Sequence, residues 1–535
     1  MTPRPTAGAR MPAASWLAAA ALLLVHAWLA WRLREPAVGL GDDATYVLLG
    51  RSLRSFAYES IHLVGAPRHV QYPPVFPGLL ALAGALFGER FALFAALEVL
   101  LSAVGLGLLF VAVRRLWGPY LALLVLAACA ANPALVESAR SVLSESPFLA
   151  LTMFTLWAAA RGDGPPPGWL AAAGAGALAA ALTRTAGVAL VVALLLTWCT
   201  ERRWRAAGGL FAAAAIVLGG WLLWSLLAPN DPSHYGYGAD FARGYGAASP
   251  VPAPATTARA VAERVVAYLT RLVPWALQLP TIPRTRVDNV IWVGVLLGFG
   301  AAGLRALWRR WRAAALFVGC YAVVLAAWPW ALERLLVPVI PLVLLTLLAG
   351  IDAVAARVGG GRLARLAPAA LVAAAVAVAA GRQATALERH QRCLASGARG
   401  CLTATSRSFD DAAAYIRAHG DPGHPVLTFR GAGLHYRTGR LTIPPGALAA
   451  PGAESRPNWG LPPGTYVLLA QTDVIERTAA TRLRARCDRL TLVRHFPPAA
   501  LLLRAADGGA DAGRAACAAL DDFLSIPWTD RGYGR

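Results

Sequence analysis

The sequence contains no lysine, so all 50 residues counted as Lys or Arg are arginines. This excludes a phosphate-binding loop ending in Gly-Lys-Ser or Gly-Lys-Thr, and it excludes catalysis through a lysine Schiff base. Neither Cys-x-x-Cys nor His-Glu-x-x-His occurs, and the nine histidines are scattered, so the sequence predicts neither a structural nor a catalytic zinc site. Charged residues are also scarce, at 15% of the chain against roughly a quarter in soluble globular proteins.

What is abundant is apolar sequence. Hydrophobic residues make up 57% of the 535 residues, and the mean hydropathy is +0.52. The formal net charge of +21 is gathered in short arginine clusters between apolar runs. That distribution is typical of cytoplasmic loops and does not indicate a nucleic-acid partner. We therefore expect a multi-pass protein of the plasma (inner) membrane.

Apolar segments of roughly 15 to 24 residues predict about eleven transmembrane helices. They lie near residues 14–33, 90–113, 120–136, 146–160, 169–183, 185–200, 207–227, 290–304, 313–330, 335–351 and 366–381. The first ends in Trp28, Trp31 and two arginines, not in a small-residue cleavage site, so we interpret it as a span and not as a signal peptide. The arginine clusters put the N-terminus in the cytoplasm and the region after residue 381 outside.

The chain changes character after residue 381, so we predict a transmembrane domain at 1–381 and a small soluble α/β domain at 382–535. Short apolar runs at 425–429, 466–470, 490–493 and 499–503 predict strands, and residues 409–419 predict an amphipathic helix. Four cysteines lie in this exported region. The simplest disulfide pairing is Cys393 with Cys401 and Cys487 with Cys517, although the two other connectivities stay open.

The first predicted outer loop, residues 41–77, is polar and lies between two apolar segments. It begins with two adjacent carboxylates, Asp42 and Asp43. Carboxylates this close to a span are costly unless they serve a polar cavity or a reaction. Residues 43–56 and 76–87 predict two interfacial helices that hold this loop at the membrane surface. The alternative is that the two aspartates only cap the first of these helices.

Five motifs follow one another at the predicted outer side. They are Gly41-Asp42-Asp43-Ala44-Thr45-Tyr46, Tyr72-Pro73-Pro74-Val75-Phe76-Pro77, Ser141-Val142-Leu143-Ser144-Glu145-Ser146-Pro147, Thr183-Arg184-Thr185-Ala186-Gly187, and Glu333-Arg334-Leu335-Leu336-Val337-Pro338. Together they resemble the GT-C superfamily of integral-membrane glycosyltransferases, in particular its protein mannosyltransferase-like and aminoarabinose transferase-like branch. The resemblance covers most of the membrane part, and a soluble outer domain at the C-terminus is also common in that branch.

The resemblance implies transfer of one sugar, a hexose or a pentose, from a polyprenyl-phosphate carrier to an acceptor at the outer face, with inversion at the anomeric carbon. By match to the acidic pair of the family's first loop, Asp42 would be the general base with Asp43 beside it. The family more often has Asp-Glu there, so the choice between the two stays open. Glu145 matches the acid of the family's second outer turn. A divalent cation is compatible with two neighbouring acids but is not required by them.

The leaving group would be a lipid phosphate, which a guanidinium can bind through two parallel hydrogen bonds. We therefore assign substrate binding to Arg184 and Arg334, and also to Tyr46 and Tyr72 of the loop motifs. Each assignment has an alternative. The arginines can snorkel to the interface or pair with a carboxylate, and the Tyr-Pro-Pro sequence can serve only to hold an extended entry to the next helix.

Glu145 has alternatives of its own. It can pair with Arg140 on a solvated turn, and Glu137 on the same turn can be the functional acid instead. At the level of the whole protein, the competing function is a transporter or a lipid-linked sugar flippase. No repeated half and no matching pair of broken spans is visible in the sequence to support it. A structural or assembly subunit would not need the outer carboxylates. The sugar, the acceptor (glycan, lipid or protein), the carrier length and the oligomeric state are not predicted.

Overall fold

A computed structural model describes residues 13–161, 167–228, 254–278, 286–328, 331–358, 360–397, 401–449, 460–472, 474–505 and 510–526. The chain forms two compact units, each assembled from several separate stretches of sequence. The first, called here the helical unit, comprises Met1–Arg34, Ala95–Gly220 and Gly244–Leu387. The second, the loop unit, comprises Glu35–Phe94, Trp221–Arg243 and Glu388–Arg535.

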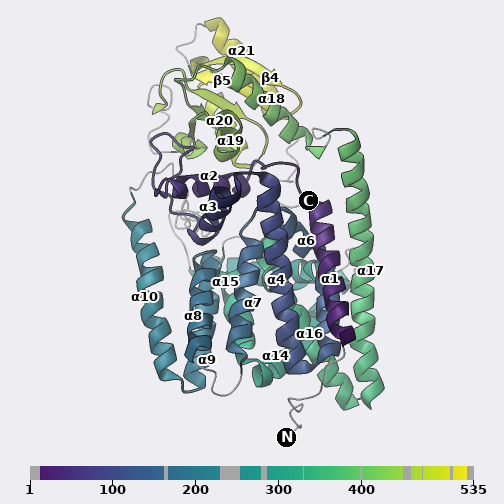
Figure 1. Ribbon diagram of the computed structural model, residues 1–535. Helices are drawn as coiled ribbons and strands as arrows, with labels where there is room; N and C mark the ends of the chain where they lie inside the picture. Colours follow the sequence, from purple (N-terminus) through teal and green to yellow (C-terminus); the bar gives the residue numbers. More distant parts are fainter. Residues whose placement is uncertain are drawn as a thin grey trace. The chain divides into compact units, whose positions relative to one another are not determined.

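The helical unit consists of helices (Figure 1). Its longer helices are α1 (Ala13–Arg32), α4 (Phe91–Trp117), α10 (Trp204–Leu226), α14 (Arg286–Arg310), α16 (Ile340–Val358) and α17 (Gly360–Ala395). Its shorter ones are α5 (Pro119–Ala130), α6 (Pro133–Arg140), α7 (Glu145–Ala159), α8 (Pro167–Ala181), α9 (Val188–Thr200), α12 (Pro254–Ala267), α13 (Val273–Ala276) and α15 (Arg312–Ala327). Three single turns, η1 (Thr185–Gly187), η2 (Tyr268–Leu272) and η3 (Glu333–Leu336), complete it.

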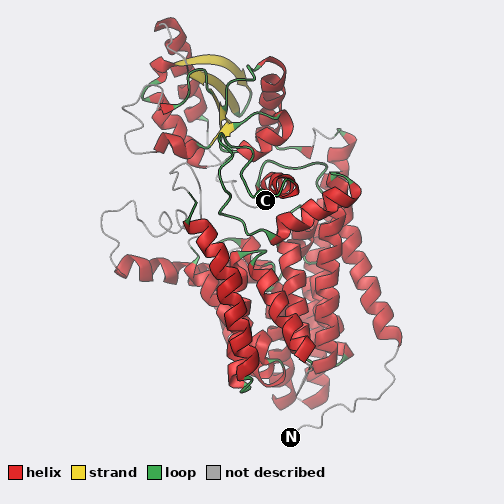
Figure 2. Ribbon diagram, turned by 60° about the vertical axis from the view of Figure 1, so that its left-hand side comes forward, coloured by secondary structure: helices red, strands yellow, loops and turns green. Residues whose placement is uncertain are grey.

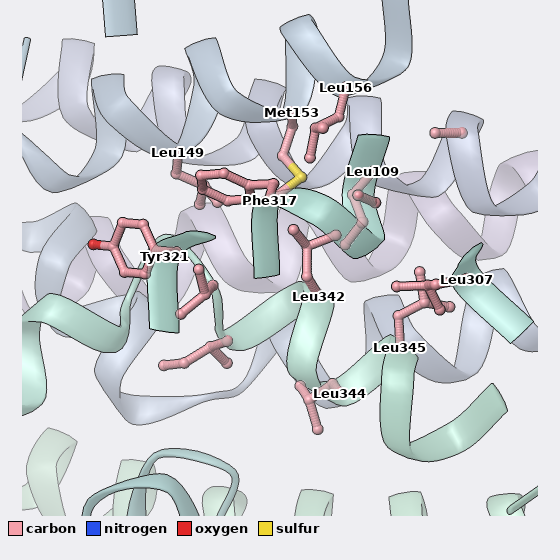
Figure 3. Packing of buried hydrophobic residues seen from close by; sticks show 14 of the residues in the cluster. Leu109, Leu149, Met153, Leu156, Leu307, Phe317, Tyr321, Leu342, Leu344 and Leu345 are labelled. Atoms are coloured by element: carbon pink, nitrogen blue, oxygen red, sulfur yellow. The ribbon is translucent and has the colours of Figure 1, made fainter. Parts of the chain in front are cut away.

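Large apolar side chains from several of these helices fill one core (Figure 3). Leu109 of α4, Leu149 and Met153 of α7, Phe317 of α15 and Leu342 of α16 are all nearly inaccessible to solvent. The sequence therefore places its bulkiest residues where helices meet, while the outward faces of α10 and α14 stay apolar and exposed. Exposed apolar faces on long helices are what a lipid environment requires.

Six described helices are long and apolar enough to cross a membrane, and a seventh span results if the bent pair α5 and α6 is counted as one. That pair bends by 61°. Asn132 caps the start of α6 with its side chain, and Pro133 at the first position cannot continue α5 because it lacks an N–H donor. The predicted segment 120–136 is therefore two helices.

Each of the eleven predicted segments coincides with a helix, and six or seven of the described helices meet the length and composition of a span. The shorter apolar helices α8, α9 with η1, and α15 have 10–17 residues, and a span needs about 20. The count supported by length and composition is six or seven. Much of the predicted outer loop at 229–289, including its Tyr- and Gly-rich start, lies outside the described residues.

In the loop unit, the first loop forms two short helices, α2 (Asp42–Arg54) and α3 (Val75–Phe87), which pack on one another. They match the two interfacial helices that the sequence predicts at 43–56 and 76–87. Gly50 allows the close packing, since a Cβ there would lie 3.2 Å from the Pro77 carbonyl oxygen.

The C-terminal part of the loop unit is an α/β domain, whose strands are yellow in Figure 2. Its five-stranded sheet has the order β2-β1-β3-β5-β4. The strands are β1 (Val426–Leu427), β2 (Thr442–Ile443), β3 (Tyr466–Leu469), β4 (Leu490–Phe496) and β5 (Ala500–Ala505). β1 is parallel to β2 and β3, whereas β5 is antiparallel to β3 and β4. Its helices are α18 (Ala404–His419), α19 (Gly431–Thr438), α20 (Val474–Arg484) and α21 (Ala510–Ser525), with η5 (Pro445–Ala449) and η8 (Cys487–Arg489).

The predicted strands and the predicted helix of this domain are confirmed, and so is the simplest disulfide pairing, Cys393 with Cys401 and Cys487 with Cys517. The strand β2 was not predicted, because two residues carry no periodicity. The domain boundary at residues 381 and 382 stays a prediction. The compact units group residues 35–94 of the first loop with the C-terminal domain.

Candidate active site

The two aspartates of the first loop occupy the first turn of α2, where helical N–H groups and the helix dipole favour negative charge. They are held differently. Asp43 is buried and accepts hydrogen bonds from the backbone N–H groups of Gly39 and, at 3.1 Å, Gly41. Burial raises the pKa of the Asp43 carboxyl, the neighbouring charge of Asp42 raises it further, and the backbone donors oppose the shift. Asp43 therefore fixes the residues that precede α2, whose N-cap is Gly41 and has no side-chain cap.

Asp42 is only half-buried, and it receives a side-chain donor. The Tyr72 hydroxyl donates to the Asp42 carboxylate at 2.8 Å. The structure thus brings together three of the predicted loop residues, because Tyr46 stacks at a tilt on Tyr72 with ring centroids 4.7 Å apart. Phe76 of α3 supports Tyr46 edge-on at 4.8 Å. The Tyr-Pro-Pro motif consequently has a contact with the acidic pair as well as its role as the entry to α3.

Tyr72 is fixed on its other side by His69, which no sequence signal singled out. The Tyr72 backbone N–H donates to His69 Nε2 at 2.9 Å, and the rings stack at 5.4 Å. Because a backbone amide can only donate, Nε2 accepts, and the ring proton belongs on Nδ1, which faces Ser60 Oγ at 3.0 Å. His69 is buried and acts as a neutral acceptor in this arrangement.

Further aromatic residues surround this group. The Tyr58 hydroxyl donates to the Tyr72 carbonyl oxygen at 2.6 Å. From the end of α10, the Trp224 indole donates to the His69 carbonyl oxygen at 3.0 Å, and Trp221 lies edge-on to Tyr58 at 6.0 Å. None of these residues was predicted, because they lie at unrelated positions in the sequence and meet only in the folded chain. Together they form an aromatic wall around Tyr72, a kind of surface on which sugar rings and apolar carriers bind.

The helical unit contains the other predicted residues. Glu145 begins α7 and pairs with Arg184, with Arg184 Nη1 2.5 Å from Glu145 Oε1. The same Nη1 donates to Ser144 Oγ at 3.0 Å. The Glu145 side chain is 2% exposed and the Arg184 side chain 13% exposed. The predicted alternative pairing of Glu145 with Arg140 is wrong, since Arg140 pairs with Glu137 at 3.2 Å.

A tight turn after α8 places Arg184. Its backbone N–H donates to the Ala180 carbonyl at 3.0 Å, and the chain then reverses through η1. Gly187 makes this turn feasible, because a Cβ there would lie 2.6 Å from backbone atoms of Ala180 and Ala181. A side chain at the last position of the Thr-Arg-Thr-Ala-Gly motif would thus clash with the backbone of α8, so glycine is required there.

Arg334 lies half-buried in η3. The Tyr321 hydroxyl of α15 donates to the Leu335 carbonyl of the same turn at 2.9 Å, and the Tyr321 ring stacks at 6.3 Å on Phe148 of α7. Tyr321 therefore contacts both the turn that carries Arg334 and the helix that begins with Glu145. Tyr321 was not predicted, because an aromatic residue within an apolar helix is typical of a packed hydrophobic core.

A second carboxylate lies beside this pair. Glu98 of α4 is fully buried next to Ser146 and Glu145. The sequence could have pointed to Glu98, because it is the one acidic residue inside the predicted span 90–113. An acidic residue within a span is by default a candidate for a functional role. Ser146 Oγ in turn donates to the Ser138 carbonyl at 3.3 Å.

Known proteins resemble the chain in sequence and in fold. Residues 71–224 match the family described as dolichyl-phosphate-mannose-protein mannosyltransferase. The fold is similar to ArnT from Cupriavidus metallidurans, solved bound to undecaprenyl phosphate. That match has a TM-score of 0.54 and 16% identity, and it covers 93% of this chain and 99% of that one. The Archaeoglobus fulgidus oligosaccharyltransferase, solved with zinc and sulfate, matches with a TM-score of 0.52 and 14% identity over 86% of this chain and 69% of that one. No curated protein matches the chain.

The chain matches the mannosyltransferase family over residues 71–224, and over most of its length it resembles ArnT in fold alone. It is an integral multi-pass membrane protein, mostly helical, with a small α/β domain. The residues matched to the mannosyltransferase family include Tyr72, Glu145 and Arg184, whereas Asp42 and Asp43 precede them. The resemblance stated from the motifs is therefore confirmed at the level of the superfamily.

A metal site is not evident in the described part of the chain, where no group of three His, Cys, Asp or Glu side chains lies close enough to hold an ion. Asp42 and Asp43 are adjacent, but Asp43 is occupied by backbone donors. The two aspartates therefore differ in what they can contact, and Asp42 is the one with a carboxylate facing another side chain.

Proposed function

We propose that this protein transfers a single sugar from a polyprenyl-phosphate carrier to an acceptor at the outer face of the plasma membrane, with inversion and with Asp42 as general base. The observation that carries the proposal is the pairing of a half-buried Asp42 with Tyr72, inside an aromatic wall, in a GT-C fold. The likeness to ArnT, which was solved with undecaprenyl phosphate, supports a lipid-phosphate carrier as donor.

The reaction assigns one task to each residue. Asp42 removes the proton from the acceptor hydroxyl as its oxygen bonds to the anomeric carbon. The bond from that carbon to the phosphate oxygen breaks, and the carrier leaves as its phosphate anion. The transition state is oxocarbenium-like, so a nearby negative group stabilises it. Because Asp43 is engaged by the Gly39 and Gly41 amides, it shapes the turn that presents Asp42.

The leaving phosphate requires a cation, and we assign that role to Arg184 with Arg334 as a second donor. Arg184 is preorganised by Glu145 and Ser144, so little rotamer entropy is lost when it meets a phosphate. Glu145 is then the partner that keeps the guanidinium in place and balances its charge before the donor binds. This role differs from direct proton transfer, because the Glu145 carboxylate is engaged by Arg184.

The test is turnover of polyprenyl-phosphate sugars by the purified protein in lipid nanodiscs. Asp42→Asn should lower kcat by about 10²- to 10⁴-fold, the usual contribution of a general base, with donor binding retained. Glu137→Gln is the matched control, because Glu137 is an exposed acid paired with Arg140, and it should leave turnover unchanged.

Two outcomes would contradict the assignment. Turnover that survives Asp42→Asn but not Asp43→Asn would make Asp43 the base. Donor turnover that is unaffected by Arg334→Ala would remove Arg334 from phosphate binding. If the wild type turns over no carrier-linked sugar at all, a transporter or flippase becomes the better description.

A further inference from the structure

The acidic pair is held by the C-terminal domain of its own unit. Arg437 of α19 donates from Nη1 to the Gly39 carbonyl oxygen at 3.0 Å and from Nη2 to the Val38 carbonyl oxygen at 3.2 Å. Asp410 of α18 fixes the same guanidinium through Nε at 2.7 Å. One planar side chain therefore binds two successive carbonyl groups directly before the aspartates, a geometry that only arginine provides.

Gly39 passes this restraint to the acids. Its carbonyl is held by Arg437, while its N–H donates to the Asp43 carboxylate. Asp43 in turn accepts from Gly41 at 3.1 Å and forms the first turn of α2 together with Asp42. A displacement of Gly39 would therefore move the N-terminal turn of α2, which carries both aspartates.

Packing reinforces the hydrogen bonds. The Leu40 side chain, between the two glycines, packs against the domain core that contains Phe409 and Leu434. The backbone approach is so close that a Cβ on Gly433 of α19 would lie 2.9 Å from the α-carbon of Leu40. Residues 38–41 are thus fitted into the domain and do not merely lie over it.

The loop is fastened to the domain a second time, shortly before Tyr72. The His62 carbonyl accepts from both the backbone N–H of Thr442, at 2.8 Å, and its hydroxyl, at 2.9 Å. Val64 then donates to the Thr442 carbonyl at 3.1 Å, so the loop extends the sheet at the β2 edge by a parallel bridge. Between the two attachments, the Arg51 guanidinium of α2 lies 4.8 Å from the ring centroid of Tyr436.

We propose that the C-terminal domain is a positioning element for catalysis, and that Arg437 is the residue through which it sets the orientation of Asp42. The inference rests on the proposed function, since it assigns the domain a part in that reaction. The domain takes part in the reaction because it holds the segment that carries the base. The titratable groups that face Asp43 are Asp42 on its own helix and Tyr436 on α19.

The experiment compares Arg437→Gln, Arg437→Lys and the control Arg484→Gln in the full chain in nanodiscs. Arg484 forms a bidentate ion pair with Asp521 at 2.6 and 2.8 Å, between α20 and α21 of the same domain. The control therefore removes an equally well-formed arginine pair that does not touch residues 38–41. Two readouts are taken: steady-state kinetics with a polyprenyl-phosphate sugar as a function of pH, and hydrogen exchange of the backbone amides.

Arg437→Gln should lower kcat by about 10- to 100-fold, the usual loss for a misplaced catalytic group, while KM for the donor changes by less than about threefold. The acid limb of its pH profile, which reports the base Asp42, should move to higher pH, because a displaced Asp42 loses the hydrogen bond from the Tyr72 hydroxyl and a carboxylate that loses a donor is a stronger base. The Gly39 and Gly41 amides should exchange faster, with the amides of β3 and β5 still protected. Arg437→Lys keeps the positive charge but loses the planar guanidinium that binds two carbonyl groups. Its kcat and its amide exchange rates should therefore lie between those of the wild type and of Arg437→Gln.

Equal kinetics, equal acid limbs and equal exchange at residues 39–41 in Arg437→Gln and Arg484→Gln would overturn the positioning role. Faster amide exchange in β3 and β5 of Arg437→Gln would mean that this variant loosens the domain itself. Arg437→Lys is then compared with the wild type instead, because it keeps the contact with Asp410 and the domain fold. A wild type without turnover would refute the proposed function alone. The exchange data would still decide whether Arg437 orders the acidic segment.

Discussion

The ion pair between Glu145 and Arg184 gives the sharpest energetic prediction. Glu145→Gln leaves the guanidinium, 13% exposed, without its counter-charge. Removing one partner from a buried pair costs about 3–5 kcal/mol, because the remaining charge stays desolvated. We expect a loss in the free energy of unfolding near the lower end of that range, since Ser144 Oγ still accepts from Arg184 at 3.0 Å.

Arg184→Gln should cost a similar amount for the converse reason, because Glu145 is 2% exposed. The double variant removes both charges and should be no worse than either single variant. The coupling energy of the double-mutant cycle is then at least about 2 kcal/mol, well beyond the roughly 0.5 kcal/mol that independent sites show. The measurement is reversible unfolding in bicelles with increasing fraction of denaturing detergent, with Glu137→Gln as a control for an exposed pair, which is worth about 0–1 kcal/mol.

Additive losses in the cycle would refute the reasoning, since they would mean that the two charges do not interact. The same proteins test the phosphate role. Arg184→Gln should raise KM for the lipid-linked donor, whereas Glu145→Gln should do so less, because the guanidinium remains.

Three further predictions concern single features. Gly187→Ala places a Cβ 2.6 Å from the backbone of α8, so it should destabilise the protein by about 1–3 kcal/mol and raise KM for the donor; unchanged thermal unfolding would contradict this. Burial raises the pKa of Glu476 above 4.5, so the folded state binds that proton more tightly, and stability should fall as pH rises from 4.5 through the raised pKa. Glu476→Gln should flatten that slope in urea titrations of the C-terminal domain's unfolding. Replacing Cys487 and Cys517 by alanine opens a loop of 30 residues and should cost about 4 kcal/mol, against about 2–3 kcal/mol for Cys393 and Cys401, whose separation is 8; an inverted order in denaturant titrations would argue against loop entropy as the cause.

The helices and strands of this chain were largely predictable, because their signals are local. The apolar runs at 466–470 and 499–503 became β3 and β5, and the acidic start of 43–56 became the first turn of α2. β2 escaped prediction because Thr442 and Ile443 are a strand only through contact with β1 and the His62–Val64 backbone. Apolar composition does not reveal where a helix stops, as where Asn132 and Pro133 divide one apolar run into two helices.

The site was predictable only where chemistry stood out against its surroundings. Adjacent carboxylates beside apolar sequence point to Asp42, and Arg184 stands out as a basic residue on the predicted outer side. His69 and Arg437 give no such signal, because a histidine in a polar loop and an arginine in a soluble domain are ordinary. Their roles arise from contacts across the chain, as in the 398 residues that separate Arg437 from Gly39.

The parallel bridge between Leu63 and Thr442 has a practical meaning for anyone who would exchange parts between homologous enzymes. A graft of residues 388–535 alone would bring an unfamiliar sheet edge to the loop and an unfamiliar α19 to residues 38–41. A chimera that carries residues 35–94 together with 388–535 takes both of these contacts, at the sheet edge and at α19, from the same parent. Recombination breakpoints for this protein therefore belong just after α1, in the first turn of α4 and within the C-terminal part of α17, where the two units divide.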